Sequence, residues 1–280
     1  MFTDILSALI VVAAVGLLFG ILLALFIHFF GIEEDQKTQK IKSVLPGINC
    51  GACGFTGCND YADALAKGTA KPNLCIPGAS AVAAELSEIL GVEAEKPKDM
   101  VAFVHCNGLC GAAGVKAIYD GINSCKASGM LFGGPKACSY GCIGCGDCVK
   151  VCVSNAICLH DGIASIDTSR CLGCGMCVKE CPKKIISMVP QETAVAVYCG
   201  SHDKGADARK ACQNACIGCK KCEKSCASQA VTVKNNCAVI DYSKCSGCGL
   251  CADSCPTGSI KKTFFPDLPE GFIIPKSNAD

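Results

Sequence analysis

Apolar side chains run from Ile5 to Ile32 without a charged residue, diluted only by Ser7, His28 and a few glycines. An α-helix needs about 20 apolar residues to cross the hydrocarbon core of a bilayer. A cleaved signal peptide fits this run less well, because no Lys or Arg precedes it and no small-residue cleavage site follows it. The pattern therefore predicts one uncleaved transmembrane helix.

The charges that flank this run predict its orientation. The first four residues contain no Lys or Arg, whereas Lys37, Lys40 and Lys42 follow the run. Positively charged flanks stay in the cytoplasm, so the rest of the chain is expected on the cytoplasmic side. The sequence thus predicts a single-pass protein of the cell membrane.

After the apolar run the hydrophobic pattern has shorter periods. Residues 33–43 are polar and charged, which predicts a short flexible stalk. Residues 78–91 place apolar side chains on one face of a helix, and residues 93–99 have the composition of a linker. The apolar positions of that helix are Ala83, Leu86, Ile89 and Leu90.

From residue 101 onward, β-prone stretches are short. Val101–Val104 and Val195–Tyr198 are typical of single strands, and two more pairs of stretches flank turns at residues 160–162 and 235–236. These lengths predict an α+β fold built from small modules rather than from one large core.

Composition shows what must stabilise these modules. Cysteine accounts for 28 of the 280 residues, Trp is absent and aromatic residues make up 6%. With so few large apolar side chains, the modules need disulfides, zinc or iron–sulfur clusters. A reducing cytoplasm disfavours disulfides, which leaves metal. The net charge of +1 provides no overall field for holding nucleic acid.

The cysteines of the second half of the chain repeat. Ten of them recur 74 residues later, which indicates a duplicated unit. The first copy holds Cys125, Cys138, Cys142, Cys145, Cys148, Cys152, Cys171, Cys174, Cys177 and Cys181, and the second holds Cys199, Cys212, Cys216, Cys219, Cys222, Cys226, Cys245, Cys248, Cys251 and Cys255.

Four segments of this repeat have the spacing C-x2-C-x2-C-x3-C, the pattern of ferredoxin runs that bind [4Fe–4S] clusters in pairs. In each pair, the fourth cysteine of one run ligates the cluster of the other run. A zinc site would instead need two C-x2-C pairs separated by a longer loop. The expected ligand sets are Cys142, Cys145, Cys148 and Cys181; Cys171, Cys174, Cys177 and Cys152; Cys216, Cys219, Cys222 and Cys255; and Cys245, Cys248, Cys251 and Cys226.

A separate group of cysteines, Cys50, Cys53, Cys58 and Cys75, lies nearer the apolar run. Four thiolates are sufficient for a [4Fe–4S] cluster, and the glycines between them let the backbone approach it closely. The spacing also fits a [2Fe–2S] centre or a zinc site, so the residues alone leave these alternatives open.

Eight cysteines remain. Cys158 and Cys237 fall in strand-like stretches, where a small buried side chain is expected. Cys106, Cys110, Cys125 and Cys138 are candidate ligands of a sixth cluster. An alternative set combines Cys106, Cys125 or Cys138 with Cys199 and Cys212, and Cys138 could also serve the first ferredoxin site.

These patterns divide the chain into residues 1–32 (anchor), 33–99 (stalk and four-Cys domain), 100–190 (first ferredoxin-like unit with a Cys-rich insertion) and 191–280 (second unit).

The chain contains no nucleotide-binding glycine motif, no flavin-attachment motif and no nucleophile motif, and its four histidines are scattered. It therefore has the residues for moving single electrons but no site for hydride chemistry. No catalytic residue is expected.

The N-terminal apolar helix, the segment LPGINCGACGFTGC and the paired ferredoxin runs together resemble the B subunit of the Rnf electron-transport complex. Shorter members of that family carry one ferredoxin pair, whereas this chain carries two. The resemblance implies a subunit of an ion-translocating ferredoxin:NAD+ oxidoreductase that relays electrons from soluble ferredoxin to membrane and flavin-bearing partners, and ultimately to NAD. It also implies a [4Fe–4S] cluster at Cys50, Cys53, Cys58 and Cys75, which makes five clusters before any sixth.

Soluble ferredoxins are typically acidic, so their docking surface should be locally basic. Lys220, Lys221 and Lys224 surround a cluster loop of the second unit and are the expected docking residues, although they could simply offset nearby negative charge. Electrons are expected to enter there and to leave through the four-Cys group nearest the anchor. The competing hypotheses are a membrane-anchored polyferredoxin that serves a non-pumping dehydrogenase or reductive activator, and a zinc scaffold.

Overall fold

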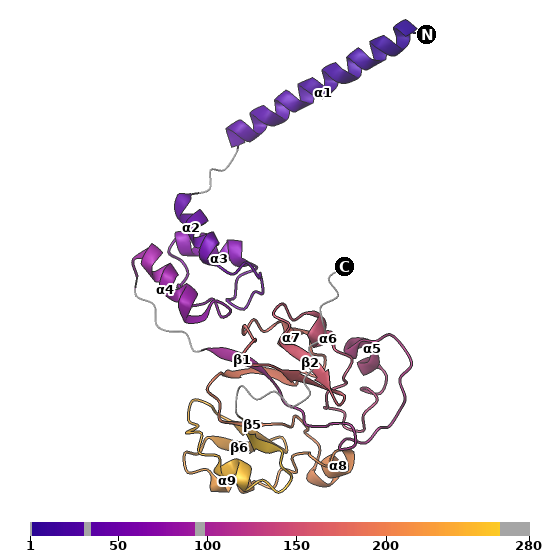
Figure 1. Cartoon of the computed structure of the whole chain (residues 1–280), viewed down its shortest axis with the longest axis vertical. Helices are drawn as coiled ribbons and strands as arrows, with labels where there is room; N and C mark the ends of the chain where they lie inside the picture. Colours follow the sequence, from indigo (N-terminus) through magenta and orange to yellow (C-terminus); the bar gives the residue numbers. More distant parts are fainter. Residues whose placement is uncertain (1, 31–34, 93–98, 264–280) are drawn as a thin grey trace.

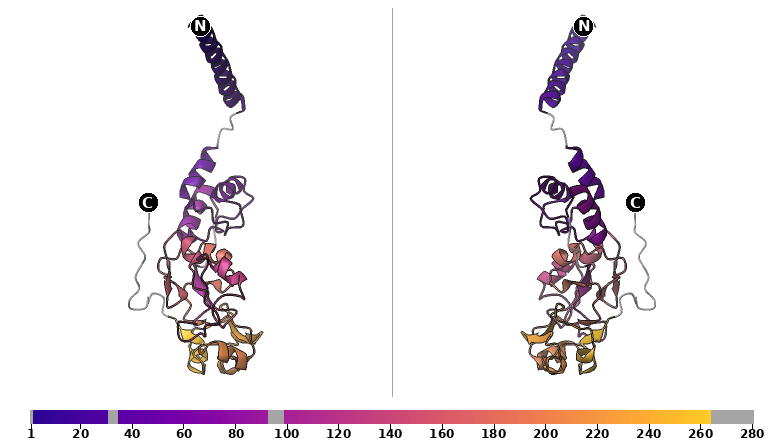
Figure 2. Two further views of the ribbon diagram at one scale, coloured as in Figure 1. Left: turned by 90° about the vertical axis from the view of Figure 1, so that its right-hand side faces the viewer. Right: turned by 90° about the vertical axis from the view of Figure 1, so that its left-hand side faces the viewer.

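The computed structural model describes residues 2–30, 35–92 and 99–263, with only part of the side chains in the first helix. Three structured parts follow one another from the N-terminal helix to the opposite end of the molecule (Figures 1 and 2). They are a small helical domain, a first ferredoxin-like unit and a second one. This linear order determines which cysteine groups can be neighbours.

The first helix, α1 (Phe2–Phe30), extends away from the remainder of the protein (Figure 1). Its described apolar side chains are exposed, for example by 67% at Leu17 and by 61% at Phe26. Within the residues described together with their side chains, no helix is long and apolar enough to cross a membrane. The last two residues of the predicted apolar run, 31 and 32, lie outside the described residues.

Three helices form the four-Cys domain: α2 (Gln36–Val44), α3 (Cys58–Ala66) and α4 (Ala79–Leu90). The prediction of a flexible stalk is wrong for residues 36–43, because α2 packs into the core of this domain. Ile41 of α2 is fully buried against Tyr61, Leu65 and Leu86. One Ile in a polar stretch does not by itself predict a packed helix. The apolar face of α2 can be recognised only once the helices that cover it are known.

The helix predicted within residues 78–91 is confirmed as α4, with Ala83 and Leu86 buried. It ends at Gly91, whose left-handed backbone (φ 69°) suits a residue without a Cβ. Residues 93–98 of the predicted linker lie outside the described residues.

The first ferredoxin-like unit contains two antiparallel two-stranded sheets, as expected from its short β-prone stretches. Strand β1 (Met100–Val104) pairs with β4 (Ile186–Pro190), and β2 (Ile157–His160) pairs with β3 (Ile163–Ile166). The predicted hairpin at residues 160–162 is confirmed. The helices are short and lie beside cysteine loops: α5 (Cys125–Met130), α6 (Asp147–Lys150) and α7 (Met176–Glu180).

The second unit repeats this arrangement. Strand β5 (Val195–Val197) pairs with β8 (Ile260–Lys262), and β6 (Val231–Lys234) pairs with β7 (Cys237–Ile240) across the predicted turn at residues 235–236. Its helices are α8 (Gly205–Ala211), α9 (Lys221–Ser225) and α10 (Leu250–Asp253).

Strand register shows which residues of the two units correspond. Val104 pairs with Ile186 in the first unit, and Val197 pairs with Ile260 in the second. Ile260 lies 74 residues after Ile186, so β5 is the structural counterpart of β1. Cys199 lies two residues after β5 and Cys106 lies two residues after β1, so these two cysteines are structural counterparts. The 74-residue offset matches Cys199 to Cys125 instead, and that match is wrong in the structure.

The two units are joined by direct contacts. His105, which follows β1, contacts the carbonyl oxygen of Val197 through Nδ1 at 2.7 Å and the hydroxyl of Ser187 through Nε2 at 2.6 Å. A small core of Val101, Phe103, Val189 and Ala196 packs between the β1–β4 and β5–β8 sheets. The cysteine loops of both units are thereby held at a fixed separation.

Candidate iron–sulfur sites

Each ferredoxin run folds as a tight loop followed by a helix of four or five residues. The residue before each helix has a left-handed backbone, and glycine occupies this position in three of the four runs. Lys220 occupies it in the remaining run, with φ 60°. The third cysteine of each run lies in the short helix and is buried.

In the first unit, cysteines from both runs meet. Burial raises the pKa of Cys148 to about 12, and the neighbouring thiolates include Cys142 of the same run and Cys181 of the other run. These three cysteines line one cavity together with Cys125. Three members of the expected cross-arranged set are thus brought together around one space, and Cys145, the fourth member, is not among the residues that line it.

The partner set shows the reciprocal arrangement. Burial raises the pKa of Cys177 to about 12, and the thiolates of Cys171, Cys174 and Cys152 add to that increase. Cys152, the last cysteine of the earlier run, therefore lies among the three cysteines of the later run.

The second unit repeats both features. Burial raises the pKa of Cys222 to about 11, with added repulsion from Cys216 and Cys255. One cavity is lined by the whole expected set: Cys216, Cys219, Cys222 and Cys255. In the other run, burial raises the pKa of Cys251, and the thiolates of Cys245 and Cys226 raise it further.

The four-Cys group also converges. Burial raises the pKa of Cys75, and the thiolates of Cys58, Cys50 and Cys53 raise it further. Helix α3 begins at Cys58, whose backbone amide donates to Asn49 Oδ1 at 2.8 Å. Four thiols therefore face the same space: Cys50 and Cys53 from one loop, Cys58 from the start of α3, and Cys75 from a later position.

The donor set fits iron–sulfur chemistry. Cysteine sulfurs accept backbone hydrogen bonds, from Ala156 to Cys152 at 3.2 Å and from Ala102 to Cys171 at 3.4 Å. Such amide donors stabilise the negative charge of a thiolate-bound cluster. Among the described residues, no three His, Cys, Asp or Glu side chains are close enough to hold a single metal ion. A [4Fe–4S] cube differs from such a site because each thiolate binds a different iron.

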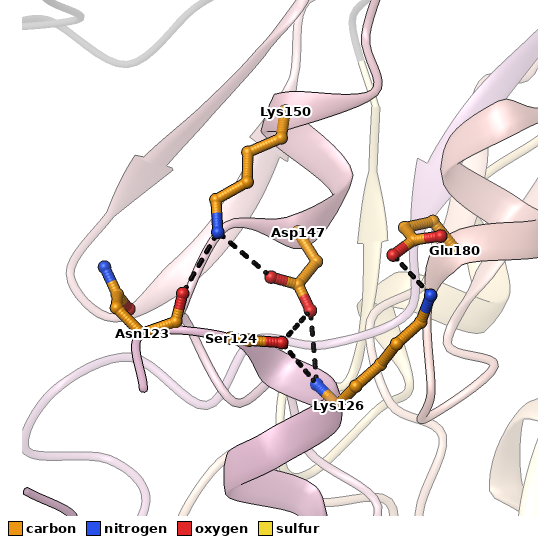
Figure 3. Close-up of polar contacts among 6 residues, drawn as sticks. All are labelled: Asn123, Ser124, Lys126, Asp147, Lys150 and Glu180. Carbon is orange, nitrogen blue, oxygen red and sulfur yellow. Dashed lines mark hydrogen bonds and ion pairs between the residues drawn. The ribbon is translucent and has the colours of Figure 1, made fainter. Parts of the chain in front are cut away.

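A buried carboxylate holds α5 against the first cluster loop (Figure 3). Asp147 accepts hydrogen bonds from Ser124 Oγ at 2.8 Å and from the amide of Lys126 at 3.2 Å, and Lys150 Nζ lies 3.4 Å away. Burial alone would raise the pKa of Asp147, but these hydrogen bonds outweigh it and lower the pKa. The ammonium of Lys126 also contacts Glu180 at 2.7 Å.

The remaining cysteines separate into distinct environments. Cys125, at the start of α5, forms a hydrogen bond with Cys145, whereas Cys110 is exposed. Cys106 and Cys138 instead line a second cavity, together with Cys199 and Cys212. The four candidates for a sixth cluster, Cys106, Cys110, Cys125 and Cys138, are therefore not brought together as one group.

Cys158 and Cys237 are buried in strands, as predicted. No pattern in the sequence indicates, however, that the Cys237 sulfur reaches a ligand loop. Cys237 Sγ donates to the carbonyl oxygen of Cys199 at 3.1 Å, and a hydrogen bond from Cys237 lowers the pKa of Cys216 to about 5. The counterpart of Cys237 in the first unit is Ile163, so this contact exists in one unit alone.

The four-Cys domain contacts the first ferredoxin-like unit at its cysteines. Lys179 of α7 donates a hydrogen bond to the carbonyl oxygen of Cys50 at 2.9 Å. Cys174 is near enough to Cys50 for the thiolate of Cys50 to raise the pKa of Cys174, after the larger effect of burial.

At the far end of the protein, the predicted docking residues Lys220, Lys221 and Lys224 are all exposed beside the exposed Cys219.

Comparison with protein families agrees with these sites. A family model for an Fe-S cluster matches residues 45–77. Models for a 4Fe-4S dicluster domain match residues 141–191 and 170–231, and a model for a 4Fe-4S binding domain matches residues 238–261. These matches and the ferredoxin-like units define the chain as an iron–sulfur protein of the electron-transfer class.

Whole-chain relatives identify the family. The chain is 46% identical to the B subunit of the proton-translocating ferredoxin:NAD(+) oxidoreductase complex of Clostridium ljungdahlii, over 90% of both chains. It is 42% identical to the B subunit of the Na(+)-translocating ferredoxin:NAD(+) oxidoreductase complex of Acetobacterium woodii, over 88% of this chain and 74% of that one. It is 36% identical to the B subunit of the ion-translocating oxidoreductase complex of Methanosarcina acetivorans, over 91% and 97%. The chain belongs to the family formed by the B subunits of Rnf complexes.

Proposed function

We propose that this chain is the electron-transfer subunit of an ion-translocating ferredoxin:NAD+ oxidoreductase, and that it receives electrons from reduced ferredoxin and relays them to membrane partners. When bound, [4Fe–4S] clusters supply one-electron chemistry with no bond to a substrate. The observation that carries the proposal is the convergence of cysteines from paired runs around enclosed spaces in both units.

Five cysteine sets are proposed as ligands. Four are the cross-arranged ferredoxin sets, and the fifth is the four-Cys group. Cysteines must lose their protons to bind iron, and burial raises the pKa of Cys148 and Cys177, so cluster binding must supply the free energy of deprotonation at these two thiols. The clusters would in turn hold the small units together.

Helix α1 is proposed as a single transmembrane anchor, with the cysteine-rich region in the cytoplasm. Its 29 residues exceed the length needed to cross a bilayer, its described apolar side chains are exposed, and Lys37 and Lys40 follow it. Protease added to intact, right-side-out cells should leave the cysteine-rich region uncut. Ready cleavage there would contradict this orientation.

The proposed direction of electron flow follows from the linear order of the parts (Figure 2). The second unit is furthest from α1 and carries the exposed lysines beside Cys219, which suits docking of an acidic ferredoxin. The four-Cys domain is nearest α1 and contacts the first unit through Cys50. Electrons would therefore enter at the second unit and leave through the four-Cys domain.

The function is tested by mixing the anaerobically purified full chain with pre-reduced ferredoxin. After mixing, the visible absorbance of the clusters should decrease as they become reduced, and ferredoxin should become oxidised. If dithionite bleaches the chain but ferredoxin does not, ferredoxin is not the donor. Co-purification of the full chain with flavin-bearing, multi-span partners separates the ion pump from a stand-alone polyferredoxin, which would purify without them.

A further inference from the structure

Four cysteines outside the five expected sets line one cavity between the two ferredoxin-like units. They are Cys106 and Cys138 of the first unit and Cys199 and Cys212 of the second. Its size is comparable to that of the two cavities lined by ferredoxin-run cysteines. The protein therefore holds a third such space, with four thiol donors in its lining.

The arrangement of these cysteines is symmetric between the units. Cys106 and Cys199 follow the equivalent strands β1 and β5 by two residues, and Cys138 and Cys212 are 74 residues apart. Each unit thus contributes the same two positions. Each copy of the unit supplies two of the four thiols. The complete four-thiol site therefore forms only where the two copies face each other.

Backbone amides already point at two of these sulfurs in equivalent ways. Cys106 Sγ accepts from the amides of Cys142 at 3.3 Å and Gly108 at 3.4 Å. Cys199 Sγ accepts from the amides of Cys216 at 3.3 Å and Ser201 at 3.5 Å. These distances match those at the expected ligands Cys152 and Cys171, so the two sulfurs accept amide hydrogen bonds of the same kind as those ligands do.

The surroundings favour a negatively charged group in the cavity. Lys136 lines it, and its ammonium donates to the carbonyl oxygens of Gly108 at 2.9 Å and Gly162 at 2.7 Å. A Cβ on Gly108 would lie 3.5 Å from Cys106 Sγ and 3.8 Å from Cys212 Sγ, so the missing side chain leaves the space between these two sulfurs open.

Contacts across the boundary hold the two halves of the site in place. Asn214 Nδ2 donates to the carbonyl oxygen of Asn107 at 2.9 Å, and the amide of Gln213 donates to the carbonyl oxygen of Ala112 at 2.8 Å. The rings of Tyr140 and His202 meet edge to face, with centroids 5.2 Å apart. The cavity is thus a defined part of the interface between the units.

We propose that Cys106, Cys138, Cys199 and Cys212 bind a sixth [4Fe–4S] cluster that connects the two ferredoxin-like units. The connecting role rests on the proposed electron-transfer function, whereas the site itself does not. Cys106 is hydrogen-bonded to the ligand Cys142 of the first unit, and Cys199 to the ligand Cys216 of the second, so the site adjoins one expected set in each unit. One electron received from one neighbouring cluster passes to the other, and no other oxidant or reductant is required.

The site is tested by iron and acid-labile sulfide content of the full chain after anaerobic purification and reconstitution. Six clusters require about 24 irons per chain, and Cys138→Ala or Cys212→Ala should reduce this to about 20. Cys110→Ala should retain about 24, because Cys110 belongs to the candidate set Cys106, Cys110, Cys125 and Cys138 but does not line this cavity. The buried control Cys158→Ala should also retain about 24. A wild-type content of about 20, or loss of four irons on replacing Cys110 but not Cys138, would overturn the proposal.

A second readout requires no variant. Diffraction from the wild-type chain at the iron absorption edge should place iron between the four sulfurs of Cys106, Cys138, Cys199 and Cys212. Zinc there, or iron at the five expected sets and none at this one, would overturn the sixth cluster. Neither readout involves ferredoxin, so failure of the proposed function would leave these results unchanged.

Discussion

Lys179 and Cys50 are joined by a hydrogen bond of 2.9 Å between the lysine ammonium and the cysteine carbonyl oxygen, although 129 positions separate them in sequence. This bond links the four-Cys domain to the helix that carries Cys177. Two proposed cluster sites are thereby held next to each other, at the point where electrons would leave the ferredoxin-like units.

Replacing Lys179 by Met should weaken this contact without removing any ligand. Because Lys179 is exposed, its contact contributes about 1 kcal/mol or less, and we expect electron transfer from ferredoxin to NAD+ in the assembled complex to slow about two- to fivefold. Iron content should not change. The matched control is Lys210→Met, another exposed lysine on a short helix of the second unit, which should leave the rate unaltered. Equal rates for both variants would show that the bond does not position the domain.

Cross-ligation in the first unit can be tested by pairing substitutions. If Cys181 shares a cluster with Cys145, then Cys181→Ala combined with Cys145→Ala removes one cluster, a loss of about four irons. Combining Cys181→Ala with Cys174→Ala should remove two clusters, or about eight irons. Iron content of the reconstituted chains distinguishes the two. The reverse ranking would mean that each run binds its own fourth cysteine.

The inferred sixth site makes a prediction in which all 28 cysteines remain present. Gly108→Val would place methyl groups against Cys106 and Cys212 and so exclude the cluster, lowering iron by about four per chain. Gly114→Val is the matched control. A Cβ at either glycine has an alanine Cβ as its nearest neighbour at 3.3 Å, but a Cβ at Gly114 has no sulfur within 4 Å. Similar iron loss in both variants would indicate general damage to the loop rather than blockage of the site.

Docking of ferredoxin should depend on the lysines of α9 and its loop. Reversing the charge of Lys220, Lys221 and Lys224 to Glu should slow ferredoxin oxidation by the purified chain about tenfold or more at low ionic strength, and should flatten its salt dependence. The control reverses Lys40, Lys67 and Lys71, which are exposed on the four-Cys domain and change the net charge equally. An unchanged rate and salt slope in the α9 variant would exclude this docking surface.

The parts of this structure that depend on local pattern can be predicted from the sequence. Both hairpins, helix α4 and the burial of Cys158 and Cys237 follow from alternation, helical periodicity and small side-chain size. Helix α2 is not predicted in this way, because a polar helix is stabilised here by partners that periodicity does not reveal. Ile41 is buried by Tyr61 of α3 and Leu86 of α4, which lie 20 and 45 positions further along the chain.

The four-thiol cavity could not be assigned from spacing, because its members come from both units. The 74-residue offset pairs Cys138 with Cys212 correctly but also pairs Cys125 with Cys199. Strand register corrects the second pair, since Cys106 and Cys199 each lie two residues after the first strand of their unit. Contacts between duplicated units belong to the tertiary structure. A repeat in the sequence does not predict which faces of the two copies pack against each other.

The most direct test of the proposed relay follows electrons through the assembled complex when the exit cluster is removed. In a Cys75→Ala variant, reduced ferredoxin should still bleach the clusters of the ferredoxin-like units, while NADH formation should decrease about tenfold or more relative to wild type and to the Cys158→Ala control. NADH formation at the wild-type rate, with the four-Cys cluster absent by iron analysis, would contradict a relay that ends at that cluster.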